Sequence, residues 1–106
     1  MSLSADQKKY YRTIAHHLKP VVTIAEAGIS EGVVNELERA LSEHELIKVK
    51  FAIPDREDRA ALIQETLKLS RAELVQQIGK IAVILRRNPK PNPRLSNILR
   101  FESGRL

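Results

Sequence analysis

The sequence contains no cysteine and no tryptophan, and aromatic residues make up only 4% of its 106 residues. The absence of cysteine excludes disulfides, thiolate metal ligands and cysteine nucleophiles. With so few aromatic residues, the core must be aliphatic. No apolar run reaches the roughly twenty residues that span a membrane, and residues 1–11 lack the apolar centre of a signal peptide. We therefore expect a soluble, cytoplasmic protein that is not exported.

The sequence also lacks the residue patterns that mark most enzymes. It has no Ser/His/Asp arrangement, no P-loop and no isolated pair of carboxylates, because its acidic residues lie along helix faces or at helix starts. His16, His17 and His44 have no accompanying carboxylate or thiolate pattern for a metal. We predict a non-catalytic protein without metal or cofactor. Its histidines cap helices or lie on the surface, with contact to a phosphate or a base as the alternative.

The positive charge of the chain is concentrated near its C-terminus. Residues 79–106 carry seven basic residues and one acidic residue, whereas residues 1–78 carry eleven basic and twelve acidic residues. With a pI near 9.8, this asymmetry favours a polyanionic partner. The alternative is a basic tail that only keeps the protein in solution. A chain of this length forms one domain with one modest core.

Residues 18–41 place a strand, a short loop and a helix start in immediate succession. The β-branched residues 21–24 after Pro20 favour a buried strand, the loop Ala25–Gly28 follows, and Ser30 can cap a helix that reaches about residue 43. Free backbone N–H groups at such a helix start bind anions, most often phosphate. An ordinary solvent-exposed connection remains the alternative, and the Glu26 carboxylate would repel phosphate.

The other elements follow from periodicity and capping residues. A first helix is predicted from about Ala5 to about His17, capped by Ser4 and Gln7, with Tyr10, Ile14 and Leu18 toward the core. Residues 46–53 alternate as a strand that carries Lys48 and Lys50 on one face, either as a phosphate track or as protection against edge pairing. A third helix starts at Asp55 and reaches about residue 70.

The C-terminal third begins with a predicted hairpin. Residues 73–78 and 81–86 are strand-like and are joined by Gly79-Lys80, which suits a type II′ turn, and the second strand is apolar on both faces and so central. We divide the chain into a domain at residues 1–87 and a Pro-rich, basic, flexible tail at residues 88–106. Residues 95–101 either dock as one helical turn or fold only on a partner.

These elements predict a single compact α/β domain in the order α-β-α-β-α-β-β. A strand-helix-strand-helix-strand core implies right-handed crossovers, and the closing hairpin makes the four-stranded sheet mixed, with helices packed on it. The sequence does not fix the oligomeric state, and we expect a monomer.

Three stretches, AHHLKPVVTIAEAGISEGVVNELERAL, HELIKVKFAIPDRED and QIGKIAVILRR, occur in an order and at spacings that resemble a known family. Over residues 3 to about 86 the chain resembles the CRM domain (chloroplast RNA splicing and ribosome maturation) in its stand-alone bacterial, YhbY-like form. The resemblance implies a fold similar to the C-terminal domain of translation initiation factor three. It also implies an RNA-binding protein that associates with ribosomal RNA or the precursor of the large ribosomal subunit and assists ribosome assembly.

The family's loop after the first strand is Gly-x-x-Gly, which resembles the loop with which KH domains clamp a nucleic-acid backbone. Here the loop reads Ala25-Glu26-Ala27-Gly28, so its first glycine is replaced by a residue with a side chain. The expected RNA contacts are Lys19, Ala25, Glu26, Ala27, Gly28, Lys48, Lys50, Lys80, Arg86 and Arg87. Further candidates are His16, His17, Arg56, Lys90 and Arg94.

The alternative function is a protein-interaction module that docks on a ribosomal protein or an assembly GTPase. Its docking surface would be the segment from Leu95 to Phe101 or the acidic helix at residues 30–43, with the basic tail incidental. The salt dependence of binding separates the two hypotheses, because phosphate contacts release counterions and apolar docking does not.

Overall fold

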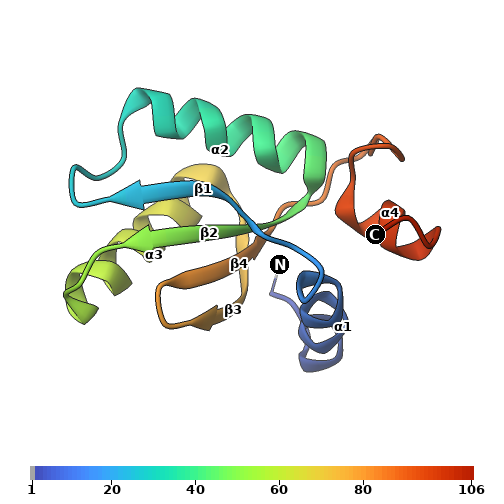
Figure 1. The fold of residues 1–106 in the computed structure, drawn as a ribbon, viewed down its shortest axis with the longest axis horizontal. Helices are drawn as coiled ribbons and strands as arrows, with labels where there is room; N and C mark the ends of the chain where they lie inside the picture. The colour runs from blue at the N-terminus through green and yellow to red at the C-terminus, as the bar shows by residue number, and fades with distance from the viewer. Residues whose placement is uncertain (1) are drawn as a thin grey trace.

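The computed structural model describes residues 2–106 and contains four helices and four strands within them (Figure 1). Their order is α1 (Ala5–Ala15), β1 (Pro20–Ala25), α2 (Glu31–His44), β2 (Leu46–Ala52), α3 (Arg56–Ser70), β3 (Glu73–Ile78), β4 (Ile81–Leu85) and α4 (Asn97–Glu102). The predicted compact α/β domain and its order from α1 to β4 are confirmed, and α4 is added beyond them.

The four strands form one mixed sheet in the order β1-β2-β4-β3. Strands β1 and β2 are parallel because α2 carries the chain back between them, and the pairs β2/β4 and β3/β4 are antiparallel. Gly79 has φ +57° and Lys80 has no positive φ, as the predicted hairpin requires. Strand β4 is central, as its apolar sequence predicted.

The larger core lies between the sheet and helices α2 and α3. Alternate residues Ile47, Val49 and Phe51 of β2 point into it because successive side chains of a strand face opposite sides. Leu37 of α2 and Ile63 of α3 meet them and are buried. These two helices therefore pack on one face of the sheet.

Helices α1 and α4 lie against the other face, at the end of the sheet where β1 and β2 begin (Figure 1). Tyr11 and Ile14 of α1 pack there with Leu46 and with Ile98 of α4. The expectation that Tyr10 faces the core was wrong, since its side chain is 39% exposed and Tyr11 is buried in its place. Both tyrosines fit a helical repeat with Ile14, so periodicity alone could not choose between them.

Capping residues set the helix boundaries as predicted. The backbone N–H groups of Gln7, Val33 and Asp58 donate to the side chains of Ser4, Ser30 and Asp55, respectively. Helix α1 ends at Ala15, two residues earlier than predicted. Helix α2 thus begins directly after the loop at residues 25–28, as predicted from the sequence.

The buried side chain of Glu45 connects residues 88–106, which we call the C-terminal segment, to the rest of the fold. One of its carboxylate oxygens accepts from Ser96 Oγ at 2.6 Å, and the other accepts from the backbone N–H of Asn88 at 2.6 Å and from Arg87 Nε at 3.3 Å. Ile98 is 2% exposed. Of the two alternatives for residues 95–101, the structure has the docked helical turn. The division of the chain at residue 87 stays a prediction, and these contacts argue against a flexible tail at residues 95–102.

Candidate nucleic-acid interface

The part of the sheet that α1 and α4 leave uncovered carries two lysines. Lys48 and Lys50 alternate with the core residues of β2, so both lie on this side, with Lys50 exposed and Lys48 half-buried. Thr23 pairs with Lys50 and Ala25 lies two residues further along β1, and both are exposed. We call these four residues the lysine face. Because Thr23 and Ala25 have short side chains, they leave the exposed Lys50 accessible to a large polyanion.

Lys80 lies at the same end of the sheet as the loop at residues 25–28. The backbone N–H of Phe51 donates to the Lys80 carbonyl at 2.7 Å, which holds the hairpin against the end of β2. Ala25 pairs with Ala52 in the neighbouring strand, so the loop starts at this end too. Lys80 is exposed, and the fold therefore brings it, Lys50 and the loop to one end of the molecule.

The loop itself closes as a tight turn. The backbone N–H of Gly28 donates to the Ala25 carbonyl at 2.8 Å, so this N–H is already used within the loop. Gly28 has φ +84°, a conformation that glycine adopts without strain, and no atom lies within 4 Å of the place of a Cβ. Ser30 then caps α2. The open space beside Gly28 lets a ligand approach the backbone of this loop closely.

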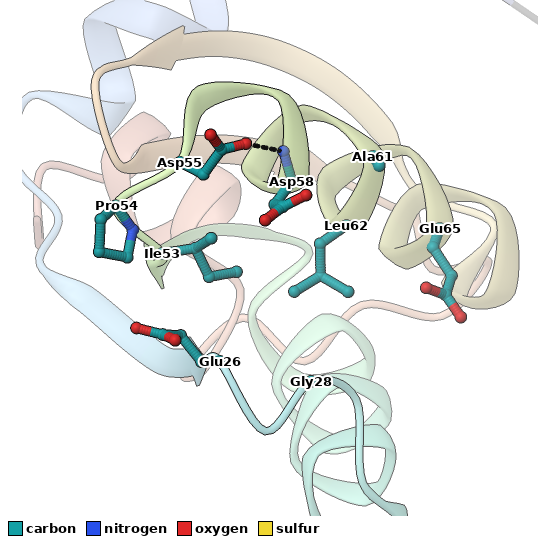
Figure 2. A pocket seen from close by; sticks show the side chains of 9 residues that line it. All are labelled: Glu26, Gly28, Ile53, Pro54, Asp55, Asp58, Ala61, Leu62 and Glu65. Atoms are coloured by element: carbon teal, nitrogen blue, oxygen red, sulfur yellow. Dashed lines mark hydrogen bonds between the residues drawn. The ribbon is translucent and has the colours of Figure 1, made fainter.

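One side of this loop, however, faces an acidic pocket of 450 Å³ (Figure 2). Glu26 lies on one side of the pocket and Asp55, Asp58 and Glu65 line the other, around the side chain of Leu62. Four carboxylates in one pocket repel a phosphate. The sequence placed Glu26 among the RNA contacts, and the pocket argues against that role.

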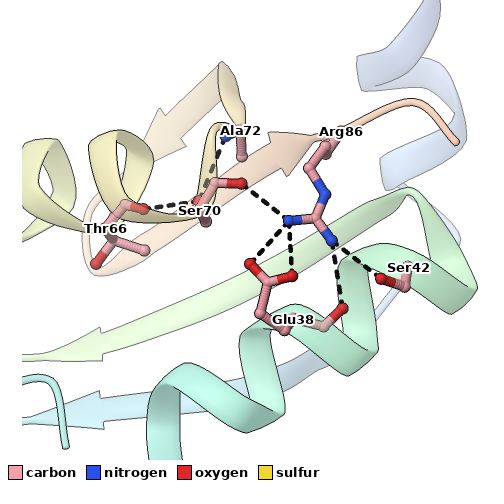
Figure 3. Close-up of polar contacts among 6 residues, drawn as sticks. All are labelled: Glu38, Ser42, Thr66, Ser70, Ala72 and Arg86. Carbon is pink, nitrogen blue, oxygen red and sulfur yellow. Dashed lines mark hydrogen bonds and ion pairs between the residues drawn. The ribbon is translucent and has the colours of Figure 1, made fainter. Parts of the chain in front are cut away.

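Arg86 lies at the opposite end of the sheet, and its guanidinium already has partners (Figure 3). Nη1 donates to Glu38 Oε1 at 2.9 Å and to the Ser70 carbonyl at 3.0 Å, and Nη2 donates to Ser42 Oγ at 3.0 Å. Strand β2 has seven residues, so about 20 Å separates this end from the loop. Arg86 therefore joins α2 to the end of α3 and does not share the footprint of Lys50 and Lys80.

Arg87 is more exposed than Arg86 but also has partners within the protein. Its Nε lies 3.3 Å from Glu45 Oε2, and Nη1 donates to the Tyr11 hydroxyl at 3.1 Å. Burial opposes its charge, but the hydrogen bond to Tyr11 and the Glu45 carboxylate outweigh burial and raise the pKa of Arg87 above its ordinary value. Its charge is fixed, and its side chain supports the C-terminal segment.

The remaining predicted cations fall at both ends of the sheet. His16 is the C-cap residue of α1, the His17 ring lies 5.7 Å from the Phe101 ring, and Lys19 directly precedes β1. These three residues are exposed and lie near the C-terminal segment, as do the exposed Lys90 and Arg94. Arg56, the first residue of α3, lies at the loop end instead. The fold therefore divides the predicted contacts into two groups, with Lys48 between them.

No pattern in the sequence marked Glu45, whose buried carboxylate binds residues 87, 88 and 96. Its φ of +61° is rare for a residue with a side chain, and its partner Ser96 is 51 residues away. Among residues 2–106, no group of three or more His, Asp or Glu side chains could hold a metal ion. In the same range, no helix is both long and apolar enough to cross a membrane.

Comparison with known proteins places this architecture in a family. The family model of the CRS1/YhbY (CRM) domain matches residues 3–86. A probable RNA-binding protein of Pseudomonas aeruginosa is 58% identical over 101 residues, which cover 95% of this chain and 97% of that protein. An RNA-binding protein of Haemophilus influenzae is 46% identical over 85 residues, which cover 80% of this chain and 86% of that protein.

A solved structure shows the same fold. The solution structure of a hypothetical protein of Staphylococcus aureus, described as a candidate RNA-binding protein, matches with a TM-score of 0.73 and 33% identity. The match covers 89% of this chain and 97% of that protein. The family resemblance that we inferred from three sequence stretches is therefore confirmed. The chain belongs to the CRS1/YhbY (CRM) domain family.

Proposed function

We propose that this protein is a non-catalytic RNA-binding protein that associates with ribosomal RNA or the large-subunit precursor and assists ribosome assembly. The observation that carries the proposal is the lysine face, an uncovered sheet surface with Lys48 and Lys50 in a chain of the CRM family. Two relatives that are named as RNA-binding proteins support the proposal that the ligand is RNA. The family resemblance supports the proposal that this RNA is ribosomal.

Binding rests on phosphate contacts in this proposal. Lys48, Lys50 and Lys80 would each neutralise phosphates and release counterions, and the backbone of the loop at residues 25–28 would set the register. Arg86 and Arg87 would support the fold beside the interface, since their guanidinium groups have partners within the protein. Lys19 would extend the contacts toward the start of β1.

Base stacking contributes little to this mode of binding. Phe51 and Tyr11 are buried, and the rings of Tyr10 and Phe101 pack against each other 6.3 Å apart. The lysine face therefore offers no aromatic platform of the kind that RRM sheets use. Recognition should follow the shape and backbone of a folded RNA, with modest sequence specificity from this domain alone.

The test is the salt dependence of affinity for a purified fragment of large-subunit ribosomal RNA. Each phosphate contact contributes about 0.7 to 0.9 to the slope of log affinity against log salt, so a double change Lys48→Gln and Lys50→Gln should reduce the slope by about 1.5. Lys68→Gln is the matched control, because Lys68 is exposed on α3 on the other side of the sheet. Equal losses in both variants would contradict the lysine face as the interface.

The acidic pocket favours a second candidate function, docking on a basic protein such as a ribosomal protein. Carboxylates surround an apolar floor of Ile53 and Leu62, a combination that suits a lysine or arginine side chain with its aliphatic stem. The segment at residues 95–101 suits this purpose less, since Ile98 and Phe101 already pack in one cluster with Tyr11 and Ile14 of α1. In a pull-down with purified ribosomal proteins, Glu65→Gln should weaken such binding and leave RNA affinity unchanged.

A further inference from the structure

A second cavity lies at the other end of the sheet from the acidic pocket. It is a partly open cavity of about 240 Å³, lined by the connection from α1 to β1, the starts of β1 and β2, the end of α2 and residues of and beyond α4. Its polar lining comes from elements far apart in the sequence, namely His17, Lys19, His44, Asn97 and Arg100. The sequence singled out His17 and Lys19, but nothing in it linked them to residues 97 and 100.

The lining of this cavity is positively charged, in contrast to the acidic pocket. Lys19 and Arg100 bring two positive charges, and His17 and His44 add ring nitrogens that can form hydrogen bonds with a ligand. No aspartate or glutamate is among its lining residues. The remaining walls are apolar side chains, Leu18, Val21, Ile47 and Leu106. A cationic rim above an apolar wall is complementary to a phosphate joined to a base.

Two polar side chains of the cavity are held in place by the backbone. His44 Nδ1 lies 2.8 Å from the Leu95 carbonyl, which can only accept, so Nδ1 carries the proton and Nε2 is the nitrogen left for a ligand. Asn97 Nδ2 donates to the Leu46 carbonyl at 2.7 Å, and Asn97 Oδ1 accepts from Arg100 Nη1 at 3.4 Å. These contacts orient His44 and Asn97 before any ligand arrives.

We propose that this cavity binds one unstacked nucleotide of a bound RNA, with the phosphate on Lys19 and Arg100 and the base against Val21 and Leu18. The inference rests on the proposed function and adds a site to it. A volume of 240 Å³ is below the range of about 300 to 1,000 Å³ that is typical for free small-molecule ligands. It therefore suits one unit of a longer chain.

Part of the cavity lies outside the region that matches the family model. The family model ends at residue 86, whereas Asn97, Arg100 and Leu106 lie beyond it. The C-terminal segment thus completes a site that residues 3–86 leave open. It adds single-stranded recognition at the end of the molecule opposite the loop.

The test measures binding of a fluorescein-labelled single-stranded RNA oligonucleotide and of the ribosomal RNA fragment by the full chain. Arg100→Gln should weaken oligonucleotide binding fivefold to tenfold, because a charge-assisted contact to phosphate is lost. Arg105→Gln is the matched control, as it removes the same charge from an exposed neighbour outside the cavity and should change affinity less than twofold. Lys19→Gln provides a second variant if Arg100→Gln does not fold.

A direct readout accompanies the affinities. An oligonucleotide that contains 4-thiouridine should crosslink to the peptide of residues 95–106 in the native protein, and less in Arg100→Gln. Unchanged affinity in both Arg100→Gln and Lys19→Gln would overturn the nucleotide site while leaving the lysine face intact. Tight, Arg100-dependent binding of free uridine monophosphate without oligonucleotide binding would also overturn it. Failure of the native protein to bind either RNA would overturn the proposed function as well.

Discussion

At the scale of single residues, a positive charge in the sequence does not reveal whether its side chain is available to a ligand. Lys50 and Arg86 look alike as candidates for phosphate contacts. In the structure Lys50 is exposed on an open sheet face, while Arg86 is held by Glu38, Ser42 and the Ser70 carbonyl. Arg86 is held because it follows β4 where α2 and the end of α3 lie beside it, whereas Lys50 is on the face of the sheet that these two helices do not cover.

The first prediction concerns Arg86. Arg86→Gln should lower the free energy of unfolding by about 2 kcal/mol, because it leaves the Ser70 carbonyl and Glu38 without their shared donor. RNA affinity of the folded variant should change little. Urea denaturation and binding measured on the same preparation check both statements.

Arg39→Gln is the control for that experiment. Arg39 pairs with Glu43, its side chain is 81% exposed, and an exposed pair of this kind contributes about 0.5 kcal/mol or less. If Arg86→Gln were as stable as Arg39→Gln and lost RNA affinity, Arg86 would be an RNA contact after all.

The second prediction concerns the Tyr10 hydroxyl, which donates to Glu102 Oε2 at 2.6 Å. The hydrogen bond to Glu102, then burial and the charge of the same carboxylate raise the pKa of Tyr10 from 10.0 to about 12. Because the folded state favours the protonated phenol, this contact stabilises α1 against α4 fully below pH 10. The contribution is lost as the pH rises through about 12.

Ultraviolet absorbance of tyrosinate measures this shift, with Tyr10→Phe identifying the contribution of Tyr10. In Glu102→Gln the pKa of Tyr10 should fall back toward 10, since the charged acceptor is gone. An ionisation of Tyr10 near pH 10 in the native protein would show that the two side chains are not in contact in solution.

At the scale of elements, helix caps, strand alternation and the hairpin were predictable because their causes are local. Ser4, Ser30 and Asp55 cap the helices that they precede, and Gly79 takes the positive φ of the turn. Helix α4 was not predictable in the same way. Its position depends on a buried carboxylate 51 residues earlier in the chain, and no local pattern reports such a contact.

The third prediction tests how α4 is held. Ser96→Ala removes the hydroxyl that donates to the buried Glu45 at 2.6 Å and that caps Leu99, so it should lower the free energy of unfolding by about 1 to 3 kcal/mol. Ser103→Ala, which removes an exposed hydroxyl bonded to the Arg100 carbonyl, should cost much less. Chemical denaturation compares the two, and equal stability of both variants would mean that Glu45 does not hold the segment.

At the scale of the whole molecule, the mixed pairing and the central place of β4 were predictable from alternating strands and helices that end in an apolar hairpin strand. The distribution of charge was not. The chain carries an acidic pocket beside the loop, a lysine face on the sheet and a cationic cavity near α4. These regions combine side chains from several elements, and sequence position alone does not bring them together.

The most direct test of the account is to map the backbone amide shifts of the labelled protein by NMR during titration with a fragment of large-subunit ribosomal RNA. We expect the largest changes at Thr23, Ala25, Lys48 and Lys50, and only small ones at Asp58 and Glu65 on the acidic side. Shift changes that centred on the acidic pocket and left the lysine face undisturbed would contradict RNA binding at the lysine face.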